Sequence, residues 1–319
     1  MIMNFIHIGV EKTGTTQLQS FFLANKKTLE KDFGINFRHS ACGAGHSSDI
    51  INLVSEMQFG DLTSPKTIDI EELKNQHLLI SSEHFSSRLV DFKSIEKLRC
   101  LLNLEVDNTI VAYLKPQEEL LVGMYAEAMK AGRDVSSLPA PNSILEKVRY
   151  GRAYFDYWFM LKLWKEAFAE NTKFIIVPYE REKLEGKDIC RDFSVNVLKG
   201  YGNIDKLVVP NNDLNKTFSP EMLLSLRRFE EQFVNVPRYK IHQLLLKFDS
   251  FGKGVFLSQE ELETFREHFI DSNAKVAELI GVEELFSDVK NFRVVRRDYI
   301  MDNSEFNQIK EQVSNELDS

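Results

Sequence analysis

The chain has 319 residues, of which 43% are hydrophobic and 28% are charged, and its formal net charge is −8. This length and composition are ordinary for a globular protein with one large buried core. Nucleic-acid binding relies on lysines and arginines gathered on one face, so an acidic chain without a basic run argues against a nucleic-acid partner.

The three cysteines, Cys42, Cys100 and Cys190, are widely spaced and form neither a zinc motif nor a C-x-x-C pair. We therefore expect reduced thiols and a cytoplasmic setting. No apolar run is long enough to span a bilayer. The apolar N-terminus lacks a basic start, and we expect no signal peptide there.

Four continuous apolar runs predict β-strands, and they are Phe5–Ile8, His77–Ser82, Thr109–Leu114 and Lys173–Val177. Unbroken apolar runs are typical of parallel strands that are covered on both faces. Helical patterns separate the strands, at 15–30, 48–58, 93–103, 117–131 and 152–169. This alternation predicts an α/β fold with a doubly wound parallel sheet flanked by helices.

The sequence changes character after the fourth predicted strand. One more helix is expected over 181–199, and residues 220–280 are mainly helical in pattern. We therefore expect an α/β core over 1–209 and a helical cap of the same domain over 210–300. The tail over 301–319 has no clear core-facing stripe, so we expect it to be loosely held.

The most informative segment follows the first predicted strand. After Gly9, the chain passes through a short polar loop into a helical pattern. The first N–H groups of a helix have no backbone partner, so a strand, a loop and a helix start together form an anion site. Lys12 adds a point charge, and Gly14 allows close approach of the backbone. Hydroxyl groups are added by Thr13, Thr15 and Thr16. The loop is predicted to hold a phosphate-like group.

This loop differs from the Walker A motif, in which a lysine follows the last glycine and a Ser/Thr hydroxyl holds Mg²⁺. Here Lys12 precedes Gly14. The order K-T-G-T-T resembles the 5′-phosphosulfate loop of sulfotransferases that use 3′-phosphoadenosine 5′-phosphosulfate (PAPS) as donor. From His7 to Gly34 the chain is similar to the bacterial, carbohydrate-type branch of that family, in the pattern H-I-G-x-x-K-T-G-T-T followed by L-Q.

Sulfuryl transfer to an alcohol or amine needs a base that takes the acceptor's proton. Glu83 follows the second predicted strand, where a charged group either lines a cleft or is buried at high cost. The resemblance implies that Glu83 is this base, and the alternative is a helix N-cap or a structural carboxylate. His84 is a second candidate. His46, in a glycine-flanked loop, is a third, because a neutral imidazole is a base near pH 7.

The segment from Tyr113 to Tyr125 resembles the family's 3′-phosphate element, in which an arginine ends the strand and a serine follows eight residues later. This chain has Lys115 and Gly123 at those positions. Lysine keeps the charge but lacks the bidentate fork of arginine, and glycine has no hydroxyl. The resemblance implies cofactor-binding roles for both positions, with Arg133 or Arg152 as other sources of the missing contact.

Residues 249–260 have the length and terminal glutamate of an EF-hand loop, but Phe251 and Lys253 supply no ligand oxygens where that loop needs them. We therefore expect no calcium site, and Ser258 is predicted to cap a helix instead. No metal is expected elsewhere in the reaction, because Lys12 is placed to neutralise the transferring group.

Together, these features predict a P-loop-like PAPS-dependent sulfotransferase acting on a hydroxyl or amine of a carbohydrate or glycolipid acceptor. The predicted catalytic residues are Lys12, Glu83 and His46. The predicted cofactor-binding residues are Lys12, Thr13, Gly14, Thr15, Thr16, Lys115 and Gly123. Two alternatives stay open, namely a P-loop nucleotide kinase or other phosphotransferase, and a non-catalytic nucleotide-binding module. Peripheral membrane association is compatible with a glycolipid acceptor.

Overall fold

The computed structural model describes residues 3–39, 47–54, 77–102, 107–147, 151–168, 172–210, 217–286 and 292–318. The chain divides into two compact units. The first unit comprises Met1–Pro116, Val148–Leu214 and Phe269–Ser287, and the second comprises Gln117–Lys147, Asn215–His268 and Asp288–Ser319. The boundary at residue 209 that the sequence suggests between a core and a cap stays a prediction.

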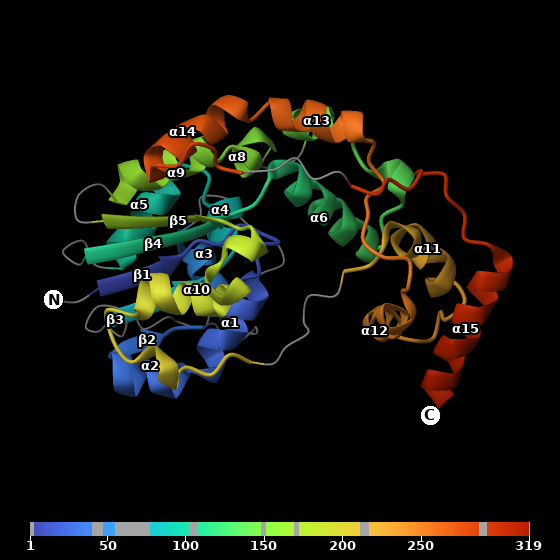
Figure 1. The fold of residues 1–319 in the computed structure, drawn as a ribbon, viewed down its shortest axis with the longest axis horizontal. Coiled ribbons are helices and arrows are strands. Elements are labelled where there is room, and N and C mark those ends of the chain that lie inside the picture. The colour runs from blue at the N-terminus through green and yellow to red at the C-terminus, as the bar shows by residue number, and fades with distance from the viewer. Residues whose placement is uncertain are drawn as a thin grey trace. The chain divides into compact units, whose positions relative to one another are not determined.

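The first unit is built on a parallel sheet, which has five strands within the described residues, in the order β2-β3-β1-β4-β5 (Figure 1). The strands are β1 (Met3–His7), β2 (Ile35–Phe37), β3 (His77–Ser81), β4 (Asp107–Leu114) and β5 (Thr172–Pro178). Phe5 of β1 lies opposite Leu79 of β3 and Thr109 of β4, so β1 is the central strand. Because the strands are parallel, their carboxyl ends meet at one edge of the sheet.

The four strands predicted from apolar runs are confirmed, and so is the α/β class with a sheet flanked by helices. The strand β2 was not predicted. It is only three residues long, and its middle residue is the polar Asn36, so it gives no apolar run. The helical pattern predicted over 15–30 is divided in two by Asn25, whose side chain bonds both to Phe21 and to Val208.

Two groups of helices flank this sheet. The first contains α1 (Thr15–Ala24), α2 (Lys26–Phe33) and α10 (Ile189–Phe193), and α1 contacts both of the others. The second contains α3 (Ser48–Val54), α4 (His84–Arg88), α5 (Phe92–Leu101), α8 (Gly151–Phe155), α9 (Tyr157–Phe168) and α14 (Ile270–Ile280). Short 3₁₀ turns at Arg181–Lys183, Glu185–Lys187 and Ile204–Lys206 and a π-helical turn at Ser194–Leu198 complete the unit.

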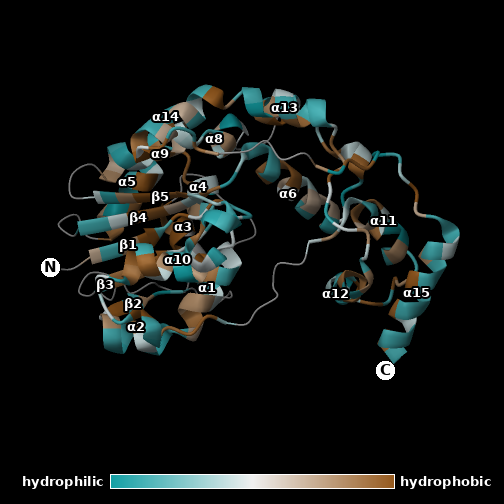
Figure 2. Cartoon of the chain, in the orientation of Figure 1, coloured by the Kyte–Doolittle hydropathy of each residue, from teal (hydrophilic) through white to brown (hydrophobic). Residues whose placement is uncertain are grey.

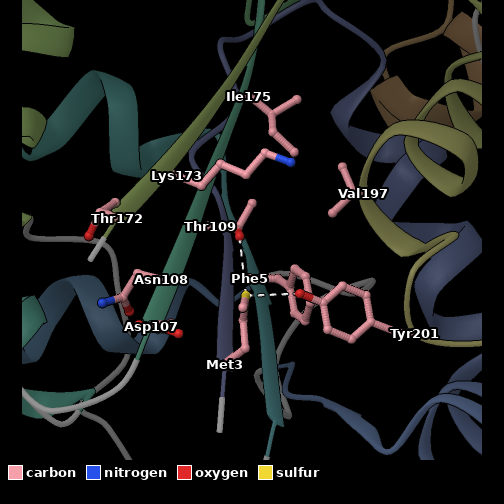
Figure 3. A pocket seen from close by; sticks show the side chains of 10 residues that line it. All are labelled: Met3, Phe5, Asp107, Asn108, Thr109, Thr172, Lys173, Ile175, Val197 and Tyr201. Carbon is pink, nitrogen blue, oxygen red and sulfur yellow. Dashed lines mark hydrogen bonds between the residues drawn. The ribbon is translucent and has the colours of Figure 1, made fainter. Parts of the chain in front are cut away.

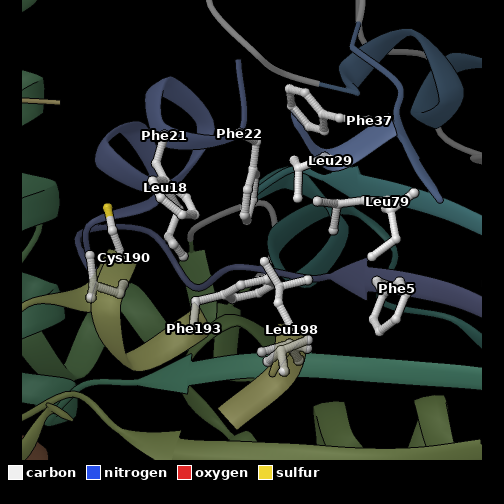
Figure 4. Close-up of a cluster of buried hydrophobic side chains, with 14 of the residues drawn as sticks. Phe5, Leu18, Phe21, Phe22, Leu29, Phe37, Leu79, Cys190, Phe193 and Leu198 are labelled. Carbon is white, nitrogen blue, oxygen red and sulfur yellow. The ribbon is translucent and has the colours of Figure 1, made fainter. Parts of the chain in front are cut away.

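A cluster of buried side chains joins the first helix group to the sheet (Figure 4). Phe5 of β1 belongs to the cluster, and Phe22 of α1 packs against Phe193 of α10 with ring centroids 4.9 Å apart and against Phe37 at 5.3 Å. Burying each such ring contributes about 1.5–3 kcal/mol. This packing fixes α1, and therefore the position of its first turn at the carboxyl end of β1.

The second unit is helical. It contains α6 (Gln117–Lys130), a 3₁₀ turn at Val135–Ser137, α7 (Pro141–Lys147), α11 (Pro220–Glu230), α12 (Arg238–Phe248), α13 (Gln259–Glu267) and α15 (Asn303–Asp318). Ser258 caps α13, as predicted, and its hydroxyl accepts a hydrogen bond from the backbone N–H of Glu261 at 3.1 Å. Within the described part of the chain, no helix has the length and apolar character needed to cross a membrane.

The tail expected to be loosely held contains the helix α15 instead. Phe306, Ile309 and Val313 are buried on one face of this helix, at the spacing of successive turns. Phe306 stacks on Phe229 of α11 with centroids 4.3 Å apart, and the guanidinium of Arg228 lies 3.7 Å from its ring. Three apolar residues among many polar ones make a narrow stripe, which Figure 2 shows as alternating hydropathy along α15.

Candidate functional site

The loop between β1 and α1 has an unusual backbone. Gly9, Lys12 and Gly14 have φ angles of 70°, 65° and 80°, in the left-handed region. Lysine pays a steric cost of about 1–2 kcal/mol in this conformation, and such strain is concentrated at functional sites. Gly14 occupies the N-cap of α1 and has no side chain to cap the helix. The loop therefore presents the start of a ten-residue helix to whatever lies beyond the sheet edge.

The predicted threonines have different environments. Thr13 is fully buried, and its Oγ1 donates a hydrogen bond to the backbone oxygen of Val10 at 2.7 Å. Its hydroxyl therefore stabilises the backbone of the loop. Thr15 is also buried at the first position of α1, whereas Thr16 is exposed. Of the three hydroxyls, that of Thr16 is the most accessible to a ligand.

Tyr179 faces the loop from the carboxyl end of β5. A Cβ atom added to Gly14 would lie 3.2 Å from the Tyr179 hydroxyl and 3.3 Å from Cδ1 of Ile189. The Tyr179 backbone N–H donates to the oxygen of Leu114 at 2.6 Å, which continues the pairing of β5 with β4 past the sheet. Tyr179 was not among the predicted site residues, although its place two residues after the predicted strand Lys173–Val177 was a usable signal.

The loop after β3 packs directly against the loop after β1. A Cβ atom added to Gly9 would overlap the Cα atom of Glu83. The backbone N–H of Ser82 donates to the oxygen of His7 and that of Ser86 to the oxygen of Ile8, both at 3.1 Å. Glycine at position 9 thus permits the approach that brings Glu83 beside the predicted anion loop.

The side chain of Glu83 is held from α1. Gln19, which is fully buried, donates from Nε2 to Oε2 of Glu83 at 3.1 Å. Glu83 occupies the N-cap position of α4, but its side chain makes no capping hydrogen bond. Glu83 thus stands at the start of α4 without capping it through its side chain, and the alternative of a structural carboxylate stays open. Gln19, a buried polar residue between the apolar Leu18 and Phe21, was not among the predicted site residues.

Glu11 adds a second carboxyl group to this site. Burial raises the pKa of Glu11, and the charge of Glu83 raises it further. The hydroxyl of Tyr154, the charge of Lys12 and the hydroxyl of Ser87 act in the opposite direction on the same pKa. Glu11 was not among the predicted site residues, because nothing in the order of residues shows that the loops carrying Glu11 and Glu83 converge.

His7 lies in the core beneath the loop. Its Nδ1 is 2.7 Å from Oγ of Ser81, the last residue of β3, while its Nε2 has no hydrogen-bond partner within the described residues. Burial lowers the pKa of His7 to about 4, although the charge of Glu83 acts to raise it. The imidazole is therefore neutral near pH 7. His7 was not among the predicted site residues and belongs only to the pattern H-I-G-x-x-K-T-G-T-T.

The remaining predicted residues are more scattered. His84 is the first residue of α4, and its backbone N–H donates to Oγ of Ser82 at 3.2 Å. Lys115 follows β4 in the first unit, and its backbone oxygen accepts a hydrogen bond from the Tyr157 hydroxyl at 2.5 Å. Gly123 lies within α6, which belongs to the second unit. His46 and its glycine-flanked loop lie outside the described residues.

The two arginines considered as substitutes also differ in setting. Arg152 is an exposed residue of α8, and its Nε lies 3.6 Å from Oδ2 of Asp156. Arg133 is exposed as well and follows α6 in the second unit. The structure thus brings together Lys12, Gly14 and Glu83 among the predicted site residues, and it adds Glu11, Gln19 and Tyr179.

No family model matches the chain. A protein of Archaeoglobus fulgidus, described as an uncharacterized protein, is 29% identical to it over 216 residues. The similar region is 66% of this chain, which spans 55% of the length of that relative. This similarity assigns neither a family nor an activity, so a function has to be argued from the geometry of the site.

Proposed function

We propose that the protein is a PAPS-dependent sulfotransferase that acts on a hydroxyl or amine of a carbohydrate or glycolipid. The observation that carries this proposal is the packing of Glu83 against Gly9, which sets a carboxylate beside a loop suited to an anion. A base next to an anion-binding loop is what sulfuryl transfer needs. A cytoplasmic setting belongs to the same proposal.

The fold supports a P-loop-like, doubly wound description of the first unit. Its central strand β1 leads through a glycine-containing loop into α1, and ligands of parallel α/β sheets bind beyond the carboxyl ends of the strands. Gly14 keeps a side chain out of the narrow gap beside the Tyr179 hydroxyl, which would lie 3.2 Å from an added Cβ atom. The loop suits an anionic group because the first N–H groups of a helix have no backbone partner and point toward the end of the strand. Lys12 lies two residues before this glycine.

In the proposed reaction, PAPS supplies a sulfuryl group whose bond to the 5′-phosphate breaks as the acceptor attacks sulfur. Lys12 and the first N–H groups of α1 neutralise the negative charge on the transferring group and on the leaving phosphate. Glu83 takes the acceptor's proton, and Gln19 holds the carboxylate in position through its 3.1 Å hydrogen bond. His7, which is neutral, contacts the Ser81 hydroxyl at the end of β3.

Ligand-induced thermal stabilisation tests this proposal. The product 3′-phosphoadenosine 5′-phosphate (PAP) should raise the melting temperature more than ADP or ATP with Mg²⁺ does at the same concentration, because a ligand stabilises the native state by RT ln(1 + [L]/Kd) and PAP should have the lowest Kd. Lys12→Ala should shrink the PAP shift and serves as the matched control. Radiolabelled PAPS with a panel of glycans and glycolipids should then give a labelled acceptor.

Two outcomes would favour the alternatives. An equal or larger shift with ATP and Mg²⁺ would contradict the sulfotransferase and support a phosphotransferase. Stabilisation by PAP without transfer to any glycan or glycolipid of the panel would support a non-catalytic binding module.

A further inference from the structure

A cavity of about 460 Å³ opens at the amino-terminal edge of the sheet, away from the candidate site (Figure 3). Met3, Asp107 and Thr172, the first residues of β1, β4 and β5, line it together with Val197 and Tyr201. Sites for small molecules have volumes of roughly 300–1,000 Å³. None of the steps proposed for sulfuryl transfer involves a residue of this cavity, so it is a separate candidate for a binding site.

One wall of the cavity is a face of the sheet, and it carries two opposite charges. Asp107 pairs with Met3, and Thr109 pairs with Lys173 of β5. Because side chains alternate along a strand, Asp107 and Thr109 share this face, and Lys173 lies beside Thr109 on it. Among the residues that the structure describes, neither Asp107 nor Lys173 forms an ion pair. The wall therefore offers a carboxylate and an ammonium group to a ligand.

Two hydroxyl groups lie between these charges and donate to a poor acceptor (Figure 3). The hydroxyls of Tyr201 and Thr109 donate to the sulfur of Met3 at 3.1 and 3.3 Å. A thioether is a weak acceptor, whereas a carboxylate is a strong one. The ring of Tyr201 is held by an edge-to-face contact with Phe5, with centroids 4.8 Å apart. An anionic oxygen that enters the cavity would therefore gain stronger hydrogen bonds from hydroxyls that are already positioned.

The remaining lining is apolar. Ile175 continues the same face of β5 two residues after Lys173, and Val197 faces it from the π-helical turn (Figure 3). Val197 belongs to the core cluster, and Ile175 packs against that cluster. The cavity thus continues the core toward the amino-terminal edge of the sheet. An apolar group of a ligand would leave water here, which favours binding.

We propose that this cavity binds a small zwitterion with an apolar side chain, of the chemical class of the apolar α-amino acids. The carboxylate of the ligand pairs with Lys173 and the Thr109 hydroxyl, its ammonium group pairs with Asp107, and its side chain packs on Ile175 and Val197. A simple organic anion would face the charge of Asp107, and a simple amine would face that of Lys173. The inference goes beyond the proposed function and does not depend on it.

Isothermal titration calorimetry of the full chain with two matched ligand series tests this inference. One series is L-phenylalanine, 2-phenylethylamine and 3-phenylpropionate, and the other is L-leucine, 3-methylbutylamine and 4-methylpentanoate. In at least one series, the amino acid should bind about tenfold or more tightly than both of its analogues, because each analogue lacks one charge-assisted hydrogen bond. Glycine, which keeps both charges but lacks an apolar side chain, should bind more weakly than that amino acid.

Two variants should change this preference in different ways. Lys173→Met removes the ammonium group and keeps an unbranched side chain, so it should weaken binding of the amino acid about tenfold and not weaken that of the amine. Asp107→Asn removes the carboxylate, so it should weaken binding of the amino acid by a similar factor and not weaken that of the organic anion. Lys199→Met, an exposed lysine outside the cavity lining, is the matched control and should bind like the wild type.

The outcomes are independent of the sulfotransferase proposal, because no experiment in this set uses PAP or PAPS. A wild-type protein that binds neither amino acid would overturn the inference. Affinities of either single-charge analogue equal to that of its amino acid in both series would also overturn it, since the cavity would then recognise only one charge. The same conclusion follows if Lys173→Met and Asp107→Asn bind the amino acid as tightly as Lys199→Met does.

Discussion

The two edges of the sheet in the first unit differ in character. The amino-terminal edge carries a cavity of about 460 Å³, lined by residues of β1, β4 and β5 and by Val197 and Tyr201 (Figure 3). Two of the hydroxyls that line it, those of Tyr201 and Thr109, donate to the Met3 sulfur, at 3.1 and 3.3 Å, and that of Thr172 donates to the backbone oxygen of Phe168 at 3.2 Å. The carboxyl-terminal edge instead gathers strained backbone, close loop contacts and coupled carboxyl groups.

This difference shows that the edge of a sheet that carries a cavity need not be the edge that carries the candidate reactive side chains. Parallel strands send their carboxyl ends, and the loops that follow, to one edge, where side chains from distant segments converge. The backbone strain at Lys12 and the overlap that any side chain at Gly9 would cause are both at this edge. A site is expected there, whereas the cavity at the opposite edge is expected to be irrelevant to donor binding.

Glu83→Gln should have the largest effect. Loss of a general base costs about 10²–10⁴-fold in turnover, while PAP affinity should stay nearly unchanged because Lys12 and the start of α1 are intact. The measurement is sulfuryl transfer from radiolabelled PAPS alongside PAP titration. Glu30→Gln, on the exposed side of α2, is the matched control.

His46→Ala is the rival variant, since His46 is another candidate for the base. A large loss of turnover in His46→Ala beside a mild one in Glu83→Gln would move the base to His46. An equally mild effect of both variants would argue against both residues as the base and would leave His84.

Lys12 allows charge and backbone strain to be separated. Lys12→Ala and Lys12→Gly should each lower turnover roughly 10²-fold, the scale of losing one contact to a developing negative charge. Lys12→Gly should in addition be more stable than Lys12→Ala by about 1 kcal/mol, because glycine adopts the φ of 65° without a steric cost. Urea unfolding measures the second effect. Equal stability of the two variants would show that the loop is not strained at this residue.

Part of this architecture could be predicted from the sequence, because it is encoded in neighbouring residues. The run Phe5–Ile8, the glycines at 9 and 14 and the helix that follows specify a strand, a loop and a helix without any distant contact. Glu83 could be proposed because a charged residue directly after a buried strand is rare. Helix α15 and strand β2 were not predicted, because α15 has only three buried apolar residues and β2 has only two apolar residues.

The rest of the site depends on contacts between distant segments. Gln19 meets Glu83 across 64 positions of sequence, and Tyr179 reaches Gly14 only because β5 pairs with β4. Glu11 becomes informative only once Tyr154 and Glu83 are placed beside it. The order of residues does not contain such pairings, so these residues had to come from the structure.

The buried His7 should make the stability of the folded protein sensitive to acid. Its pKa is about 4 in the folded protein, below the ordinary 6.5, so the unfolded chain binds the proton more readily. Stability is therefore fully present above 6.5 and is lost as the pH falls toward 4, by up to about 3 kcal/mol. Urea unfolding across this range should show a shallower loss of stability for His7→Gln. An identical pH slope in both proteins would contradict the buried, neutral imidazole.

Lys173→Ala should have the smallest effect on PAP binding. It tests whether the donor binds in the cavity at the amino-terminal edge of the sheet. Lys173 is the basic residue among those lining the cavity, and it is exposed. If the cavity held the anionic donor, losing a charge-assisted hydrogen bond worth about 1.5–3 kcal/mol would weaken PAP binding at least tenfold. If the donor binds at the carboxyl-terminal edge, the change is a surface substitution, and PAP affinity should stay within about twofold of the wild type. A tenfold loss in Lys173→Ala beside an unchanged affinity in Lys12→Ala would reverse the roles of the two edges.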